Sequence, residues 1–144
     1  RATAQLVKDS AYLLQVPAIA PEQSPMMSLP SILLTFDRFD EPRPFRLDWV
    51  IDTAAVQPQI IDLLACHASQ VFEWLPSLIS DADDDGPFDT AWLTRFYQRK
   101  PAAVAKKARA LNPAHSELRF AEAFEVSDYG SPFDNAHFDF LPGR

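Results

Sequence analysis

Three stretches of the chain have the length and the hydrophobic pattern of β-strands. Residues 31–37 form an apolar run, which predicts a short strand that is buried on both faces. Residues 46–52 alternate between apolar and polar positions and predict a strand with one apolar face. Residues 118–126 alternate in the same way and predict the third strand.

Apolar residues that recur every three or four positions predict three helices. The strongest pattern covers residues 60–75, where the apolar stripe continues for about four turns before Pro76 ends it. Another helix is expected over residues 89–111, with a kink at Pro101, because proline cannot donate the helical hydrogen bond. The remaining helix spans residues 2–15. One of its faces carries Thr3, Leu6, Val7, Ser10 and Leu14.

The order of these elements is helix, strand, strand, helix, helix, strand, which indicates an α/β protein. Three strands make a thin sheet with two exposed edges. We therefore expect residues 1–144 to form a single domain with an incomplete sheet, as the C-terminal portion of a larger domain.

The composition narrows the class of protein. Of the 144 residues, 47% are hydrophobic, which is too apolar for a disordered chain. The net charge of −7 disfavours nucleic acid as a partner, because an acidic surface repels phosphate. No apolar run reaches the ~18 residues of a membrane span, so no membrane is expected as a partner. The single cysteine, Cys66, excludes an internal disulfide, and a reducing cytoplasm is the expected location.

Three segments carry motifs that point to one family. The chain opens with RATAQLVKDSAYLL, a helical stretch with Arg-Ala at its start. The segment IDTAAVQPQIIDLLACHASQ joins a strand end to a helix that finishes in His-x-Ser-Gln at residues 67–70. The segment RFAEAFEVSDYGSPF contains an Ala-Glu-x-Phe core at residues 121–124. In this order and spacing they resemble the C-terminal part of the LmbE/PIG-L family of zinc-dependent N-deacetylases, the family of GlcNAc-PI de-N-acetylase.

This resemblance implies a Rossmann-like three-layer fold and a hydrolase that removes an acetyl group from an amino sugar or a similar amide. It also implies a zinc cofactor, held by a His-Pro-Asp-Asp motif and a later His-Pro-Asp-His motif. Neither motif occurs in these 144 residues, whose histidines are His67, His115 and His137. We therefore expect the chain to bind no zinc alone, and to be inactive without the missing N-terminal metal-binding half.

Two residues of the resembling helix are candidates for binding a small-molecule substrate. His67 lies on or beside the apolar stripe of that helix. It either lines the substrate pocket or is a histidine at the edge of the core that bonds to a backbone carbonyl. Gln70 either bridges to a loop near the site or belongs to the polar surface.

Trp92 and Glu122 are the other two substrate-binding candidates. Trp92 either stacks on a sugar ring at the mouth of the pocket or anchors its helix on the sheet. Glu122 is expected on a buried strand face, where a carboxylate needs a partner such as Arg1 or Arg46. Either this strand face lies near an active-site crevice, or Glu122 pairs with one of these arginines in a contact that can be purely structural. The residues expected to share its face are Leu118, Phe120, Phe124 and Val126.

Two other functions remain open beside the deacetylase. The chain either keeps the deacetylase-like α/β architecture as a non-catalytic binding or interaction module, or it is an unrelated α/β domain. A wrong order of helices and strands would favour the unrelated domain. For the deacetylase and for the non-catalytic module alike, the unpaired sheet edges predict contact with the missing half or self-association.

The absent motifs generate a prediction about zinc. The purified 144-residue chain should retain no stoichiometric zinc after dialysis, because a catalytic zinc site needs three protein ligands and an open position. Elemental analysis measures the zinc content directly. One zinc ion per chain would contradict this expectation.

Overall fold

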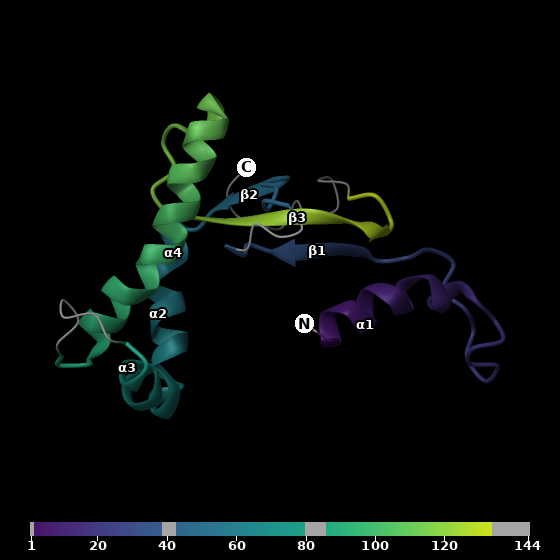
Figure 1. The fold of residues 1–144 in the computed structure, drawn as a ribbon, viewed down its shortest axis with the longest axis horizontal. Coiled ribbons are helices and arrows are strands. Elements are labelled where there is room, and N and C mark those ends of the chain that lie inside the picture. Colours follow the sequence, from purple (N-terminus) through teal and green to yellow (C-terminus); the bar gives the residue numbers. More distant parts are fainter. Residues whose placement is uncertain (1, 39–42, 80–85, 134–144) are drawn as a thin grey trace. The chain divides into compact units, whose positions relative to one another are not determined.

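A computed structural model describes residues 2–38, 43–79 and 86–133 of the chain (Figure 1). The described elements follow the order helix, strand, strand, helices, strand, which confirms the order predicted from the sequence. The protein is therefore a mixed α/β protein. The main elements are α1 (Ala2–Ala11), β1 (Ser31–Thr35), β2 (Trp49–Asp52), α2 (Gln57–Ala65), α3 (Leu75–Ser77), α4 (Thr90–Leu111) and β3 (Ala121–Gly130).

The described residues fall into two compact units. The first contains the residues up to Trp49 and those from Ala123 onward, and the second contains Val50–Glu122. The chain passes between the units within β2 and within β3. The single-domain expectation stays a prediction.

The sheet has three strands in the order β1-β3-β2, so the last strand of the sequence lies in the middle (Figure 1). β1 is antiparallel to β3, with Leu33 opposite Val126 and Thr35 opposite Phe124. The prediction that the first strand is buried on both faces was wrong, because its three central residues are only half-buried and its two ends are exposed. β1 is an edge strand, and an edge strand has a neighbour on one side only.

The register expected for the last strand was wrong by one residue. Ala121, Ala123 and Glu125 are buried, whereas Glu122 is exposed and Phe124 is half-buried. The prediction from the sequence placed the strand face that carries the large aromatic residues in the core. Small alanine side chains can instead be buried completely where other parts of the chain approach closely, and a shift of one residue exchanges the two faces of a strand.

The second unit has a hydrophobic core built from its helices. Its centre consists of Ile61, Val71, Trp92 and Leu93, each less than a tenth exposed. α2 and α4 lie side by side and supply most of this cluster (Figure 1). Seven further residues pack around it, namely Leu64, Ala65, Phe72, Leu75, Ile79, Phe96 and Tyr97.

The helix predicted over residues 60–75 is interrupted. α2 ends at Ala65, and the chain resumes as a π-helix over Ser69–Trp74. α4 by contrast is continuous through the buried Pro101, and its first turn is capped by the Asp89 carboxylate, which accepts a hydrogen bond from the Trp92 backbone N–H (2.9 Å). Within the described ranges, no helix is long and apolar enough to cross a membrane.

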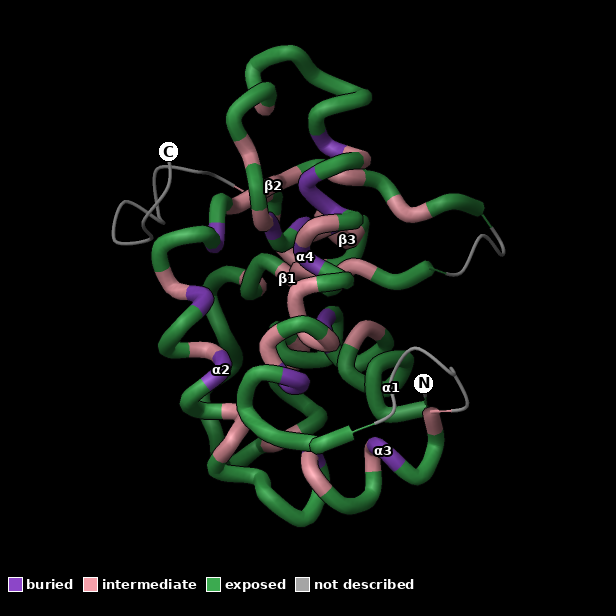
Figure 2. The backbone as a smooth tube through the Cα atoms, turned by 90° about the vertical axis from the view of Figure 1, so that its left-hand side faces the viewer, coloured by how far each residue is buried: buried purple, intermediate pink, exposed green. Residues whose placement is uncertain are grey.

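The first helix forms where it was expected, but its apolar face is not buried. α1 continues into a 3₁₀-helix over Tyr12–Gln15, which together match the predicted residues 2–15. Figure 2 shows α1 exposed over most of its length. Leu6 and Val7 are 65% and 56% exposed, and Ala11 is the residue of α1 that is buried. The apolar side of α1 therefore has no cover within the described residues.

The core of the second unit generates a stability prediction. Trp92→Ala should lower the free energy of unfolding by about 3–5 kcal/mol, because it removes a buried indole and leaves a cavity. Trp74→Ala is the matched control, since Trp74 is 55% exposed and should cost much less. Urea unfolding followed by circular dichroism compares the two variants, and equal losses would show that Trp92 is not the centre of the core.

Candidate functional site

His67 and Gln70 lie together on the surface of the second unit. Both are exposed, so the expectation that His67 lies on or beside the buried stripe was wrong. The reason is the interruption after α2, which rotates the following residues away from the direction that a continuous helix would give them. The backbone carbonyl of His67 accepts hydrogen bonds from the N–H groups of Gln70 (2.9 Å) and Val71 (3.0 Å). These backbone bonds place His67 before the π-helix and Gln70 within it, and π-helices are rare elements that often mark functional positions.

Trp92 is in the core, not at a pocket mouth. Trp92 is 1% exposed. Its indole stacks on the Phe96 ring (5.2 Å between ring centroids) and contacts the Phe88 ring edge to face (5.1 Å). No face of the indole is open to a sugar ring in this structure, which favours the helix-anchor alternative. Among the described residues, the buried indole Nε1–H has no hydrogen-bond partner.

Glu122 is exposed, so its predicted burial was wrong; among the described residues no arginine forms a salt bridge with it, and Arg1 lies outside them. The Glu122 carboxylate lies near Tyr97 of α4. The pKa of the Tyr97 hydroxyl is raised, mainly by burial and further by the negative charge of Glu122. The described structure therefore places His67 beside Gln70 and Glu122 near Tyr97, and the pocket described below is lined by none of the four predicted residues.

The buried carboxylate of this strand is Glu125, three residues further on. Its side chain is 6% exposed and makes hydrogen bonds with both side-chain nitrogens Nη1 (2.9 Å) and Nη2 of Arg43. It also accepts a hydrogen bond from the backbone N–H of Arg46 (3.0 Å). A two-pronged arginine contact of this kind fixes both partners in orientation. Burying a carboxylate against arginine was the expected chemistry, but it occurs at Glu125 and not at Glu122.

Asp48 extends this cluster to the backbone of β3. The Arg46 guanidinium donates to the Asp48 carboxylate (3.1 Å from Nη2) and to the carbonyl of Val126 (3.0 Å). Asp48 in turn accepts a hydrogen bond from the Val126 backbone N–H (2.9 Å). Two arginines and two carboxylates cancel in charge. The cluster therefore ties the segment before β2 to β3 and leaves no surplus charge to attract an ionic ligand.

The environment of Glu125 decides what its carboxylate can do. The pKa of Glu125 is lowered to about 2, mainly by the hydrogen bonds from Arg43. Burial opposes this shift, and the hydrogen bond from the backbone N–H of Arg46 adds to it. A general acid or base works best when its pKa lies near the working pH. Glu125 therefore stays ionised near neutral pH and serves the scaffold.

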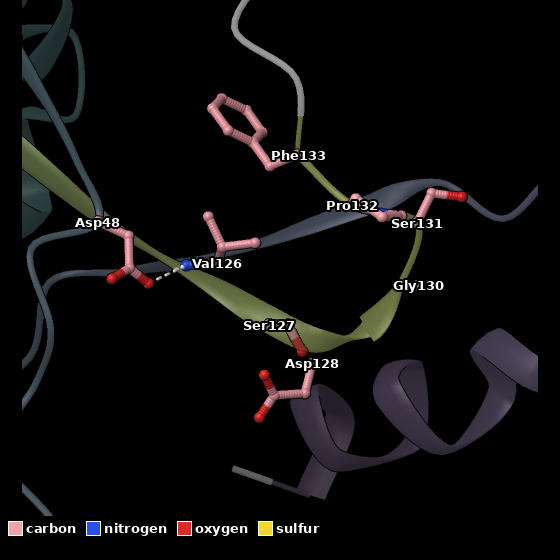
Figure 3. A pocket seen from close by; sticks show the side chains of 8 residues that line it. All are labelled: Asp48, Val126, Ser127, Asp128, Gly130, Ser131, Pro132 and Phe133. Carbon is pink, nitrogen blue, oxygen red and sulfur yellow. Dashed lines mark hydrogen bonds between the residues drawn. The ribbon is translucent and has the colours of Figure 1, made fainter.

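An open pocket of about 530 Å³ lies beside the far end of β3. Its lining consists of Asp48, Val126, Ser127, Asp128, Gly130, Ser131, Pro132 and Phe133 (Figure 3). In Figure 3 the Asp128 carboxylate points away from the Phe133 ring, and the Asp48 carboxylate is turned to the Val126 N–H. Binding sites for small molecules bring a few polar groups to bear on one point. These side chains do not converge, so the pocket is not a strong candidate site.

The described residues do not fit a catalytic zinc. Among them, no three His, Cys, Asp or Glu side chains gather in a way that would hold a metal ion. His137 lies outside the described residues. The ligands of the zinc that the sequence resemblance implies would have to come from other residues, and the expectation that this chain binds none stays a prediction.

Sequence reasoning missed the role of Arg43 and Glu125. Glu125 lies on the opposite face from Glu122, and the pattern of large apolar residues had assigned that face to solvent. A signal was present, because Arg43 and Arg46 stand close together before the second strand and offer two guanidinium groups to one carboxylate. Nothing in the local sequence says which glutamate of β3 receives them.

The cluster generates a prediction with a pH dependence. Glu125→Gln should lower the free energy of unfolding by about 1–3 kcal/mol near neutral pH, because the partly exposed arginines lose a charged hydrogen-bond partner. The folded-state pKa of Glu125 lies below its ordinary value of 4.5, so the carboxylate stabilises the fold above that pH. The stability difference between the two proteins should therefore shrink as the pH falls from about 4.5 to about 2. Urea unfolding at several pH values measures it, with Glu122→Gln as the exposed control; a difference that does not change with pH would contradict the assignment.

Comparison with known proteins finds no protein family, no curated protein and no solved structure that matches this chain. What the chain does is therefore inferred from its own residues, from their geometry and from the motifs described above.

Proposed function

We propose that the chain is the C-terminal part of a zinc-dependent N-deacetylase that acts on an acetylated amino sugar or a similar amide. The observation that carries this proposal is the ordered set of three family-like segments in the sequence. The first lies on α1 and the 3₁₀-helix after it, the second on β2, α2 and the first residues of the π-helix, and the third on β3 and the turn that follows. The first and third segments form a helix and a strand as expected, whereas the helix of the second segment ends at Ala65, before His67.

The order of the elements supports the proposal over an unrelated α/β domain. A wrong order would have favoured chance similarity, and the observed order agrees with the expected one. A Rossmann-like three-layer fold is part of the proposal. Antiparallel strands are common at the edge of an otherwise parallel sheet, so the sheet formed by β1, β3 and β2 is compatible with the border of such a fold.

We assign the zinc and the general base to the part of the enzyme that carries the His-Pro-Asp-Asp and His-Pro-Asp-His motifs. The contribution of the present chain is then the scaffold and one side of the substrate site. His67 and Gln70 are the residues proposed to contact substrate, because both are exposed and fixed by backbone hydrogen bonds. Glu122 remains a weaker candidate because it is exposed. Trp92 is buried in the core and is not proposed to contact the substrate.

The partner proposed for this chain is the metal-binding half of the same enzyme. The exposed apolar residues of α1 and of the segment after it favour contact with more protein, since monomeric proteins rarely leave large apolar patches open. A cytoplasmic location is part of the proposal, on the strength of the single unpaired cysteine. A small-molecule amide is the proposed substrate, and neither nucleic acid nor membrane is a proposed partner.

The proposal is tested first on the coding sequence upstream of Arg1. It should encode His-Pro-Asp-His shortly before Arg1 and His-Pro-Asp-Asp further upstream. The longer protein, loaded with zinc, should release acetate from an N-acetylglucosamine derivative, and a chelator should abolish this release. His67→Ala and Gln70→Ala should raise KM in that assay if they contact substrate, while Gln59→Ala, an exposed position on α2, serves as the control.

Two outcomes would reject the enzyme assignment. An upstream sequence without the two motifs would favour the non-catalytic interaction module. A zinc-loaded protein that carries both motifs but releases no acetate from any acetylated amino sugar would show that the family resemblance does not extend to the reaction.

A further inference from the structure

β1 presents an unpaired edge that is uncharged along its whole length. The sheet order places β1 at one border, and among the described residues no strand other than β3 pairs with it. Its sequence, SILLT, contains no charged residue, and its three apolar side chains are only half-buried. Natural proteins usually protect such an edge with charges, proline or a covering element, because it otherwise recruits another strand.

The hydrogen-bond pattern shows which backbone groups of β1 face this open edge. The N–H of Phe36 donates to the carbonyl of Ala123 (3.1 Å). In an antiparallel ladder, residues that bond to the neighbouring strand alternate with residues whose N–H and C=O point the other way. With Leu34 opposite Glu125, the same register turns the backbone groups of Leu33 and Thr35 away from β3. These two residues therefore offer their donors and acceptors to a further strand.

This arrangement is complementary to itself. We propose that a second copy of the chain binds along this edge, so that two β1 strands pair antiparallel about a two-fold axis at Leu34. Leu33 of one copy then lies opposite Thr35 of the other, and symmetry repeats the same pair on the other side of Leu34. Each pair exchanges N–H···O=C bonds, and the two Leu34 side chains meet at a non-hydrogen-bonded position, where side chains are closest. Most soluble oligomers are two-fold dimers of this isologous kind.

Charge favours β1 over the other border of the sheet. The chain carries a net charge of −7, so two copies approach each other best through a neutral surface. β1 provides one, and in the proposed register no charged residue faces a like charge: Asp37 faces Ser31, and Arg38 faces Pro30. β2 is shorter, ends in the exposed Asp52 and follows directly after Asp48.

The first unit also has little apolar core of its own. Of the buried apolar residues in the described ranges, only Ala11 and Ala123 belong to it. Pairing through β1 would cover more of Ile32, Leu33 and Leu34. Leu33 and Thr35, which carry the hydrogen bonds of the proposed pairing, lie two and four residues from Ser31, near which the contact between Lys8 and the Tyr129 ring (5.7 Å) places α1. The inference uses only the backbone and charge of β1, so it does not depend on the deacetylase proposal.

Cysteine cross-linking tests the register. In a Cys66→Ser background, Leu34→Cys should form an intermolecular disulfide with oxidised glutathione, since Cα atoms at such a pair lie about 4.5 Å apart, within the ~4.4–6.8 Å that a disulfide spans. Ile32→Cys is the matched control. Its two copies would be offset by four residues, or roughly 13 Å along the strands, and should not cross-link.

Light scattering after size exclusion tests the dimer without any cross-link. The unmodified chain should have twice the 16.2 kDa mass of one copy and should dissociate on dilution. Thr35→Pro removes an N–H that points to the open edge and leaves the ladder with β3 intact, so it should weaken dimerisation at least tenfold. Thr35→Val keeps that N–H and should leave the dimer unchanged, with circular dichroism confirming that both variants fold.

Each result decides the proposal. A dimer that cross-links at residue 34 but not at residue 32, and that is weakened by Thr35→Pro, supports it. A monomer at every concentration overturns it. A dimer that cross-links equally at both positions, or that does not cross-link at residue 34, also overturns it, because the copies then meet elsewhere or in another register.

Discussion

The buried carboxylate of Glu125 holds the sheet of this protein to the segment that precedes β2. Two arginines bind it, and Asp48 completes the cluster by bonding to the backbone of Val126 on the same strand. Among the described residues of this unit, the large apolar side chains are half-buried or exposed, and the rings of Trp49, Phe124 and Phe133 pack on one another. A charged group taken out of water is costly unless it is paired and hydrogen-bonded. Glu125 is the β3 carboxylate that forms salt bridges with both arginines among the described residues.

The second unit is organised in the usual way, by an apolar cluster between helices. This cluster lies next to two exposed polar residues. Val71 is buried in the cluster, and the adjacent Gln70 is exposed together with His67. The interruption between α2 and the π-helix thus turns one part of the chain inward to the core and displays two polar side chains outward. The backbone at these two positions is held by the hydrogen bonds from Gln70 and Val71 to the carbonyl of His67.

The two units differ in how complete they are. The second buries large side chains such as Trp92 and Leu93, whereas the first leaves apolar residues of α1 and an uncharged strand edge open. Apolar area in contact with water favours association with more protein. This contrast is compatible with a chain that supplies scaffold and part of a substrate site, while other protein supplies the chemistry. The proposed dimer uses β1 of the first unit, and the proposed substrate contacts, His67 and Gln70, lie in the second unit. The two proposals therefore do not depend on each other.

The sequence by itself determined the type and order of the elements. The spacing of apolar residues predicted α1, α2, α4 and the three strands, because periodicity is a local property that each segment carries alone. It also indicated a buried carboxylate near Ala123, with an arginine partner as one of two alternatives.

Only the tertiary structure decided which carboxylate this was, where the helix after Ala65 is interrupted, and which residues remain exposed. The strand register depends on how closely distant segments approach Ala121 and Ala123, and a strand pattern with aromatic residues on one face and alanines on the other fits either orientation. His67 and Trp92 show the same limit: an apolar period gives the face on which a residue lies, but whether that face meets a core or solvent depends on residues far away in the sequence.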